Sequence, residues 1–213
     1  MGMFSRLKEM RDRIVYKAIK QHVREKGVFY DIGCHDGRYS IPFIRTNTVY
    51  GFEPNPGRKH KGFQVFKVAL GKEEKLAKLY LHKKDYYSSI REEALKEKLR
   101  KRVKNIHMES VMMVKLDDFI REWKLEPPDV IKIDVQGGEY DVLCGAYQTL
   151  VKCRPVLIVE VHTTLLKYFG HSFEELKNFL TGLDYTYEVL KHRGKELHLL
   201  ATLNNRATVD FKS

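Results

Sequence analysis

The 213-residue sequence contains only three cysteines, Cys34, Cys144 and Cys153, and no Cys-x-x-Cys pair. An odd number of widely spaced cysteines does not build a disulfide framework, and structural zinc sites normally bring two cysteines within a few residues of each other. We therefore expect reduced thiols, with neither disulfides nor a zinc site.

Long apolar runs are also missing, since none approaches the ~20 residues that a helix needs to span a bilayer. The first residues, MGMFSRLKEMRDRIVYK, mix acids and bases and have no apolar stretch of the signal-peptide type. Hydrophobic residues make up 43% of the chain, which favours a globular protein over a disordered one. We expect a soluble, cytoplasmic protein with no membrane span, in which a helix within residues 1–27 packs on one domain of residues 28–213.

Positive charge is abundant and unevenly distributed. The formal net charge is +11, and residues 54–104 hold 16 Lys plus Arg against 6 Asp plus Glu. Such a segment could bind nucleic acid, an anionic surface or an acidic small molecule. It could equally be a solvated helix whose charges pair with each other, as the spacing in REEALKEKLRKRVK allows.

Apolar spacing predicts alternating strands and helices followed by a hairpin. The predicted strands are Val28–Ile32, Thr48–Phe52, Phe63–Leu70, Leu76–His82, Val111–Val114, Val130–Asp134, Pro155–His162, Tyr185–Leu190 and Leu197–Leu203. The predicted helices are residues 3–26, residues 38–46, Glu92–Lys104, Asp117–Trp123 with an aspartate cap, a segment reaching about Leu150, and Ser172–Gly182 with a capping box. Strands such as VIKID and VLIVEV are apolar throughout, which indicates an α/β fold with a parallel sheet buried on both faces.

Acids and a histidine stand at the ends of four predicted strands: Asp31, Glu53, Asp134, and the pair Glu160 and His162. Ligands of open parallel sheets bind beyond the carboxyl ends of the strands. Four strands that end in charged groups would be costly to bury unless that edge faces solvent or a ligand. The sequence therefore predicts a site at this edge.

The first of these strands runs into the turn DIGCHDG, where Gly33 and Gly37 permit positive φ and close approach of a ligand. The spacing G-x-x-x-G is not the G-x-G-x-x-G of NAD-binding turns, so an NAD-dependent oxidoreductase is the least favoured enzyme. Glu53 follows Asp31 by 22 residues, at the end of the next strand, where a carboxylate accepts hydrogen bonds from ribose hydroxyls. The pair predicts a ligand that contains a nucleoside.

The stretches DIGCHDGRYS and VYGFEPNP resemble the first two motifs of class I S-adenosylmethionine-dependent methyltransferases. Further on, VKLDDFI, VIKIDVQGGEYDVLCGA and RPVLIVEVH resemble the markers of the FkbM family within that class, over roughly residues 28–165. The resemblance implies a Rossmann-like fold with a mostly parallel seven-stranded sheet, a C-terminal antiparallel hairpin and helices on both faces. It also implies S-adenosylmethionine as the cofactor and methylation of hydroxyls on sugars or other small molecules.

Carried over to this sequence, the resemblance implies that Asp31, Gly33 and Gly37 border the methionine half of the cofactor. Cys34 and His35 would contribute backbone atoms at the same turn.

The remaining implied cofactor contacts come from later strands. Glu53 would hold the ribose with Asn55 nearby, Ala69 and Leu70 would lie beside adenine, and Asp134 would lie close to the reactive methyl group.

Methylation of a weakly acidic hydroxyl requires removal of its proton, for which the strand ends offer Asp134, Glu139 and His162. His162 titrates near neutrality but could simply end a strand, and Glu139 suits the first turn of a helix whatever its role. Lys132 is expected to pair with an acid, Glu160 or Asp134.

No His/Cys group has metal-ligand spacing, and no metal site is predicted, although Asp134, Glu139 and Glu160 could gather a divalent cation. Where the family more often has glutamate and alanine, this chain has Gln136 and Gly138, which weakens a role of position 136 as base or ligand.

Two alternatives stay open beside a small-molecule hydroxyl acceptor, which could be anionic. The basic segment 54–104, with Tyr86 and Tyr87, could bind RNA for methylation, because aromatic side chains among cations can stack bases. The departure at Gln136 would suit a domain that binds the nucleoside without transferring a methyl group. The residues leave the acceptor, the general base and the oligomeric state open.

Overall fold

The structure is a computed structural model that describes residues 3–82, 87–99 and 106–204. A seven-stranded sheet forms its centre, with the strand order β10-β11-β9-β8-β1-β2-β3. These strands are β1 (Val28–Ile32), β2 (Thr48–Phe52), β3 (Gln64–Phe66), β8 (Val130–Ile133), β9 (Val156–His162), β10 (Tyr185–Arg193) and β11 (Glu196–Leu203). β1, β2, β3, β8 and β9 pair in parallel, whereas β11 is antiparallel to both β9 and β10. The predicted class I methyltransferase fold with its C-terminal antiparallel hairpin is confirmed.

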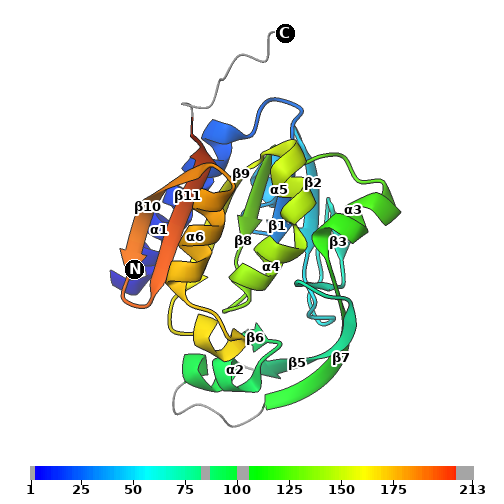
Figure 1. Cartoon of the computed structure of the whole chain (residues 1–213), viewed down its shortest axis with the longest axis vertical. Helices are drawn as coiled ribbons and strands as arrows, with labels where there is room; N and C mark the ends of the chain where they lie inside the picture. Colours follow the sequence, from blue (N-terminus) through cyan, green and yellow to red (C-terminus); the bar gives the residue numbers. More distant parts are fainter. Residues whose placement is uncertain (1–2, 83–86, 100–105, 205–213) are drawn as a thin grey trace.

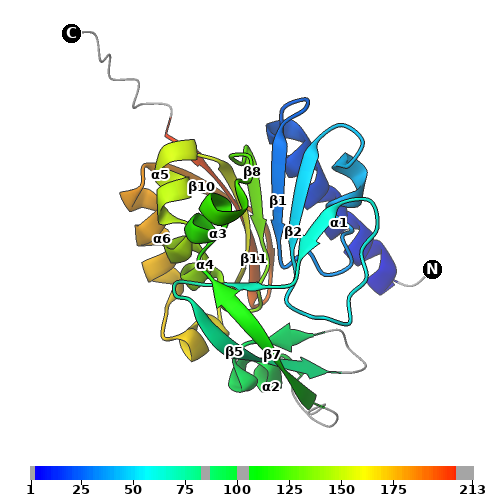
Figure 2. The same cartoon turned by 90° about the vertical axis from the view of Figure 1, so that its right-hand side faces the viewer.

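Helices cover both faces of this sheet (Figures 1 and 2). On one face lies α1 (Met3–His22), whose Val15, Ala18 and Ile19 join a buried cluster with residues of β1, β2, β8 and β9. The other face carries α3 (Leu116–Trp123), α4 (Glu139–Gly145), α5 (Tyr147–Cys153) and α6 (Phe173–Gly182). Because both faces are covered, β1 and β8 are buried at every position, which explains their continuous apolar runs.

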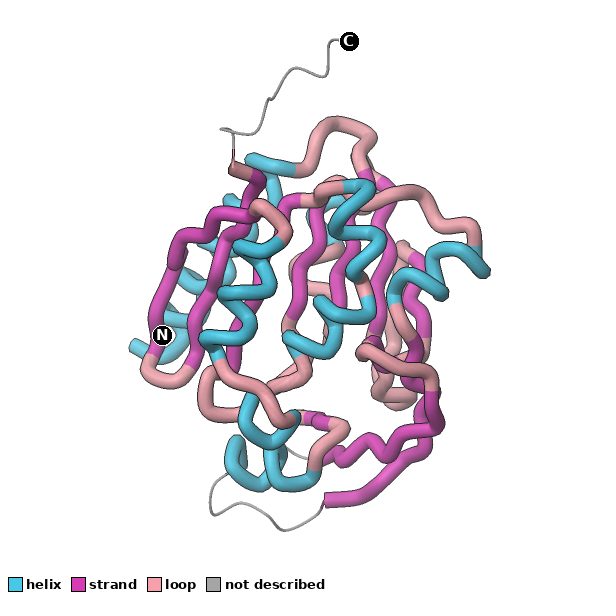
Figure 3. The backbone as a smooth tube through the Cα atoms, in the orientation of Figure 1, coloured by secondary structure: helices cyan, strands magenta, loops and turns pink. Residues whose placement is uncertain are grey.

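A second, smaller sheet has the strand order β4-β7-β5-β6. It consists of β4 (Ala69–Leu70), β5 (Lys75–His82), β6 (Ser88–Ser89) and β7 (Ile106–Val114), with α2 (Glu92–Leu99) beside it. Figures 1 and 3 show this small sheet and α2 beyond the end toward which β8 points. The small sheet therefore lies over the carboxyl ends of the parallel strands.

Several predicted elements differ from the structure. The segment 38–46 forms only a short 3₁₀ turn, Ile41–Phe43, because Pro42 offers no backbone N–H to continue a helix. The predicted strand Phe63–Leu70 is divided into β3 and β4, which belong to different sheets, and the predicted strand Val111–Val114 is the end of the longer β7. The predicted basic helix is seen as Glu92–Leu99, and its continuation to Lys104 lies outside the described residues.

Asp117 caps a helix, but not the one predicted. α3 begins after Lys115 without a side-chain cap. The carboxylate of Asp117 instead accepts hydrogen bonds from the backbone N–H groups of Gln148 and Thr149, both at 2.8 Å, in the first turn of α5. α5 is therefore a separate helix and not the continuation of α4. In α6, the capping box predicted at Ser172 and Glu175 is confirmed.

Among the described residues, no helix has both the length and the apolar character needed to cross a membrane.

Candidate active site

A pocket of about 890 Å³ lies between the carboxyl ends of the parallel strands and the small sheet. Its walls come from the turns after β1, β2 and β8, from the end of β9, from β6 and α2, and from the turn between β10 and β11. This volume falls within the range of roughly 300–1,000 Å³ that is typical of small-molecule sites.

The glycine turn after β1 forms one end of the pocket. Gly33 has φ +73°, and a Cβ atom there would lie 1.9 Å from the backbone oxygen of Asp134. The amide of Gly33 donates to Phe52 O at 2.8 Å, which fixes the turn against the end of β2. Only glycine allows the β1 and β8 turns to approach this closely, so this residue joins the two ends of the site.

Glu53 lines the pocket from the end of β2 and is only 5% exposed. Its two carboxylate oxygens accept hydrogen bonds from the backbone amides of His35 and Asn55, each at 2.9 Å. Each carboxylate oxygen can accept a second hydrogen bond, so Glu53 keeps acceptor capacity toward the pocket. Its position suits the predicted contact with ribose hydroxyls.

Asp31 and Lys132 form a buried ion pair between β1 and β8, at 3.1 Å from Oδ1 to Nζ. The two residues are direct partners in the parallel register, so the pair follows from the strand alignment. Burial lowers the pKa of Lys132, but the neighbouring carboxylates of Asp31, Asp134 and Glu160 together outweigh it, and the pKa is raised overall. The prediction that Lys132 pairs with an acid is confirmed, but its partner is Asp31 and not Glu160 or Asp134, because Asp31 is the residue opposite Lys132 in the register.

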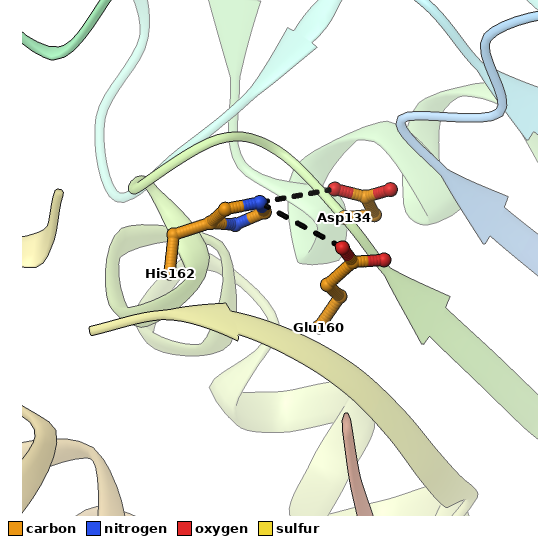
Figure 4. Close-up of side chains that lie close together, drawn as sticks. All are labelled: Asp134, Glu160 and His162. Carbon is orange, nitrogen blue, oxygen red and sulfur yellow. Dashed lines mark ion pairs between the residues drawn. The ribbon is translucent and has the colours of Figure 1, made fainter. Parts of the chain in front are cut away.

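The second end of the site adjoins the glycine turn through the backbone of Asp134, and there Asp134, Glu160 and His162 converge from β9 and the turn after β8 (Figure 4). Nε2 of His162 lies 4.0 Å from Oδ1 of Asp134 and 3.9 Å from Oε1 of Glu160. The other ring nitrogen, Nδ1, lies 2.8 Å from Oε1 of Glu139, which also accepts a hydrogen bond from the amide of Gly137. Glu139 therefore holds the imidazole from behind, and Nε2 points into the cluster.

Burial and mutual repulsion alter the acidity of this cluster. Burial, and then the charge of Glu160, raise the pKa of Asp134 above its ordinary value. Burial favours the neutral form of His162, but its hydrogen bond to Glu139 and the charges of Glu139 and Asp134 together outweigh that effect, and the pKa of His162 is raised. Burial is the largest influence on both groups, and neighbouring carboxylates raise both pKa values.

The structure brings most of the predicted site residues to one pocket. Those that line it are Gly33, Cys34, His35, Glu53, Ala69, Leu70, Asp134 and His162. Asp31, Gly37, Asn55 and Glu139 lie behind the lining and support it. Asp31 also accepts a hydrogen bond from Ser40, and both of its oxygens are thus committed within the protein. Its effect on a ligand would be exerted through Lys132, which does line the pocket.

Cys34 is buried beside the glycine turn, and burial, followed by the charges of Asp31 and Glu53, strongly raises the pKa of its thiol. A thiol of this kind does not act as a nucleophile near neutral pH. This agrees with a role limited to its backbone.

Sequence reasoning singled out Tyr87 and the basic segment 54–104, but it did not indicate that the small sheet and the C-terminal hairpin together form part of the pocket. This wall includes Tyr87, Ser88, Ser89, Lys98, Lys195 and Glu196. Lys98 pairs with Glu196, a residue almost one hundred positions away, and the pair joins α2 to β11. Local patterns carry no signal for such a contact.

Gln136 has φ +60°, and its amide nitrogen donates to Oδ1 of Asp134 at 2.9 Å. The residue that departs from the family pattern therefore contacts the candidate catalytic carboxylate. An amide here places a donor, and not a further carboxylate, next to Asp134.

Within the basic segment 54–104, several cations are paired with acids, including Lys75 with Glu73 and Lys96 with Glu92. Tyr87 lines the pocket, with Nζ of Lys98 lying 5.5 Å from its ring centroid. Tyr86, the other aromatic residue predicted to stack a base, lies outside the described residues.

Comparison with known proteins agrees with this architecture. A family model described as the methyltransferase FkbM domain matches residues 31–189. The 2-O-methyltransferase NoeI of Sinorhizobium fredii is 31% identical over 149 residues, which are 60% of this chain and 60% of NoeI. The crystal structure of methyltransferase FkbM from Methylobacillus flagellatus KT superimposes with a TM-score of 0.54 at 14% identity, over 83% of this chain and 43% of that one. The latter match supports the fold, and the family model covers most of the chain. This chain thus belongs to the FkbM methyltransferase family.

Proposed function

We propose that the protein transfers the methyl group of S-adenosylmethionine to a hydroxyl oxygen of a sugar or another small molecule. The observation that carries the proposal is a single pocket with a nucleoside-type end at Gly33 and Glu53 and a cluster of acid–base groups at Asp134 and His162. The name of the relative NoeI, a 2-O-methyltransferase, supports a hydroxyl acceptor.

The residues present fit this cofactor. Gly33 leaves no room for a side chain and keeps the turn open to a close ligand, and Glu53 retains acceptor capacity for ribose hydroxyls. Ala69 and Leu70 offer a small apolar wall beside them, as expected for an adenine ring. Bound S-adenosylmethionine supplies a methyl group on a positively charged sulfur.

The cluster at the other end suits the acceptor. As the acceptor oxygen bonds to the methyl carbon and the carbon–sulfur bond breaks, the hydroxyl proton must leave. His162 and Asp134 present a nitrogen and an oxygen to the pocket where this proton would depart. Glu139, behind the lining, is a positioning residue that fixes the imidazole of His162.

Charge in the pocket wall is nearly balanced. The wall holds four basic residues, Arg38, Lys98, Lys132 and Lys195, and five acidic ones, Glu53, Glu97, Asp134, Glu160 and Glu196. This balance favours a polar acceptor rich in hydroxyls. A strongly anionic acceptor or an RNA strand would need an excess of cations in the pocket wall to neutralise its negative charges.

The test is a thermal-shift and transfer experiment. S-adenosylhomocysteine should raise the melting temperature and NAD should not, since only a ligand that binds the native state stabilises it. Radiolabelled methyl groups from S-adenosylmethionine should then appear on members of a panel of sugars and oligosaccharides. No shift with S-adenosylhomocysteine would refute the cofactor. Methylation of RNA, with binding that weakens steeply as salt rises, would favour the RNA alternative, and a shift without transfer to any acceptor would favour a non-catalytic domain.

A further inference from the structure

We propose that Asp134, Glu160 and His162 form a binding site for one divalent cation of the Mn²⁺ or Mg²⁺ kind, open toward the acceptor end of the pocket. The ligand atoms that the three side chains offer lie within 4.8 Å of one another. The suggested role of the cation in the reaction rests on the function proposed above, whereas the site itself rests on the geometry that follows.

The orientation of His162 is the first argument. Its Nδ1 lies 2.8 Å from a carboxylate oxygen of Glu139, which can only accept, so Nδ1 carries a proton. Nε2 then points into the cluster, and the side chain is only 2% exposed. Among the described residues Nε2 has no hydrogen-bond partner, and the nearest carboxylate oxygens stand at 3.9 and 4.0 Å. A buried nitrogen aimed between two carboxylates at this distance has room for an ion between them.

The groups behind the cluster give the second argument. Histidines that bind metals usually donate their other N–H to a carboxylate or carbonyl, and ligating carboxylates are themselves held by further partners. Here Glu139 holds His162, Gln136 donates to Asp134 at 2.9 Å, and Nε2 of His198 lies 3.0 Å from Oε2 of Glu160. Hydrogen bonds from outside the cluster therefore hold His162 and Asp134, and a second histidine stands beside Glu160.

Charge gives the third argument. Lys132 is paired with Asp31, and three acids, Asp134, Glu139 and Glu160, gather around the imidazole of His162, with His198 on the outer side of Glu160. Glu139, Glu160 and His162 are almost fully buried. Buried charges are normally paired or coordinate a metal, and a divalent cation would compensate this excess of acids.

The distances suit such an ion after small side-chain movements. Ligand atoms lie about 2.0–2.6 Å from cations of this type, so neighbouring and opposite ligands are separated by roughly 3–5 Å. Two carboxylates and one imidazole leave further positions for water or a hydroxyl from the pocket, and carboxylate and water ligands suit Mg²⁺ and Mn²⁺. His162 takes the place that the sequence alone gave to Glu139, because Glu139 lies behind the imidazole and faces away from the two other acids.

At this position the ion would bind the acceptor hydroxyl. A cation lowers the pKa of a bound hydroxyl, so that its proton can pass to water at neutral pH as the new oxygen–carbon bond forms. Without an ion, His162 would have to accept this proton itself.

The experiment measures Mn²⁺ binding by the loss of the EPR signal of the free ion, with the metal-free full chain and no cofactor. We expect about one Mn²⁺ per chain, displaced by excess Mg²⁺. The variants Glu160→Gln and His162→Gln should weaken binding by at least about tenfold, the lower end of what changes around metal ligands produce. Asp141→Asn is the matched control, because Asp141 also pairs with a histidine, His171 at 2.8 Å, away from this cluster, and it should leave binding unchanged. Cooperative melting of each variant confirms that it folds.

Absence of binding by the unaltered chain, or equal binding by the folded Glu160→Gln and His162→Gln variants, would overturn the cation site. The melting shift with S-adenosylhomocysteine, measured with a chelator present, separates this result from the proposed function. If that shift persists without Mn²⁺ binding, only the cation site is refuted. If Mn²⁺ binds at the cluster and no shift occurs, the cation site stands and the proposed cofactor does not.

Discussion

The two ends of the pocket differ in how their polar groups are satisfied. At the glycine-turn end, both oxygens of Glu53 accept backbone hydrogen bonds, and Asp31 is matched by Lys132 and Ser40. At the cluster end, Nε2 of His162 faces carboxylates that lie too far away for hydrogen bonds. The first end is a rigid frame in which every one of these groups has a protein partner. The second end carries unmatched polarity, which is typical of groups that act on a ligand.

The difference has a cause in the chain. At the glycine-turn end most partners lie within one stretch of the chain, as His35 and Glu53 do, although Lys132 reaches Asp31 from β8. The cluster end combines β8 and β9 with His198 of β11, and its polar groups meet only when the sheet has formed. Both ends therefore depend on the alignment of β1 with β8, and the cluster depends in addition on β9 and β11.

The largest effect on stability should come from Gly33→Ala, because Gly33 lies where the turn after β1 contacts the turn after β8. The new Cβ would lie 1.9 Å from Asp134 O, so the turns after β1 and β8 must separate. We expect the free energy of unfolding to fall by more than about 3 kcal/mol, or the folded state to be lost, because backbone strain and overpacking act together. Urea unfolding measures this. Gly170→Ala is the control, since Gly170 also has positive φ, at +81°, but has nothing within 4 Å of its Cβ position. Equal losses in the two variants would show that the close contact between the turns is unimportant.

Glu139→Gln should affect the cluster end alone. The imidazole of His162 would lose the charge that holds it, and the rate of methyl transfer at saturating substrates should fall by about 10–100-fold. Affinity for S-adenosylhomocysteine, measured by calorimetry, should not change, because Glu139 bonds to His162 and Gly137 and does not line the pocket. Asp141→Asn, on the same helix, should leave both quantities as they are. A loss of cofactor affinity equal to the loss of rate would contradict the separation of the two ends.

Glu53→Gln should affect the glycine-turn end alone. Loss of the charged acceptor should weaken binding of S-adenosylhomocysteine by about 1–2 kcal/mol, if that group holds the ribose. Calorimetry measures the affinity, with Asp36→Asn as the control for removing a carboxylate from the neighbouring turn after β1, since Asp36 itself does not line the pocket. Unchanged affinity would remove Glu53 from the cofactor site, and Mn²⁺ binding should be the same in both variants.

The smallest effect is expected from Lys98→Ala, which breaks the pair between α2 and Glu196 above the cluster. Stability should fall by less than about 1 kcal/mol, because both side chains are partly exposed. The Michaelis constant for the acceptor should rise while that for S-adenosylmethionine stays constant. Steady-state kinetics with each substrate varied in turn would show this, and an equal change in both constants would place Lys98 outside the acceptor wall.

The sequence predicted the central strands well because their apolar runs are bounded by glycine, proline and acids. It failed where an element depends on distant partners. Asp117 is a residue type that commonly caps the helix it begins, yet its carboxylate caps α5. Lys132 likewise pairs with Asp31 on a neighbouring strand and not with the acids expected from the sequence. The strands Leu76–His82 and Val111–Val114 were predicted, but their assembly into a separate small sheet was not, since β4 and β7 pair across more than forty residues.

The sequence alone determined the order of strands and helices, the glycine turn and the acids at four strand ends, because these follow from local periodicity and backbone preference. It also determined membership of the methyltransferase family through those same turns. Only the tertiary structure decided which strand-end groups share a pocket, that Glu139 stands behind His162, and that Asp31 is committed to Lys132. Register between strands fixes such neighbours, and register is set by packing of the whole sheet and not by any one segment.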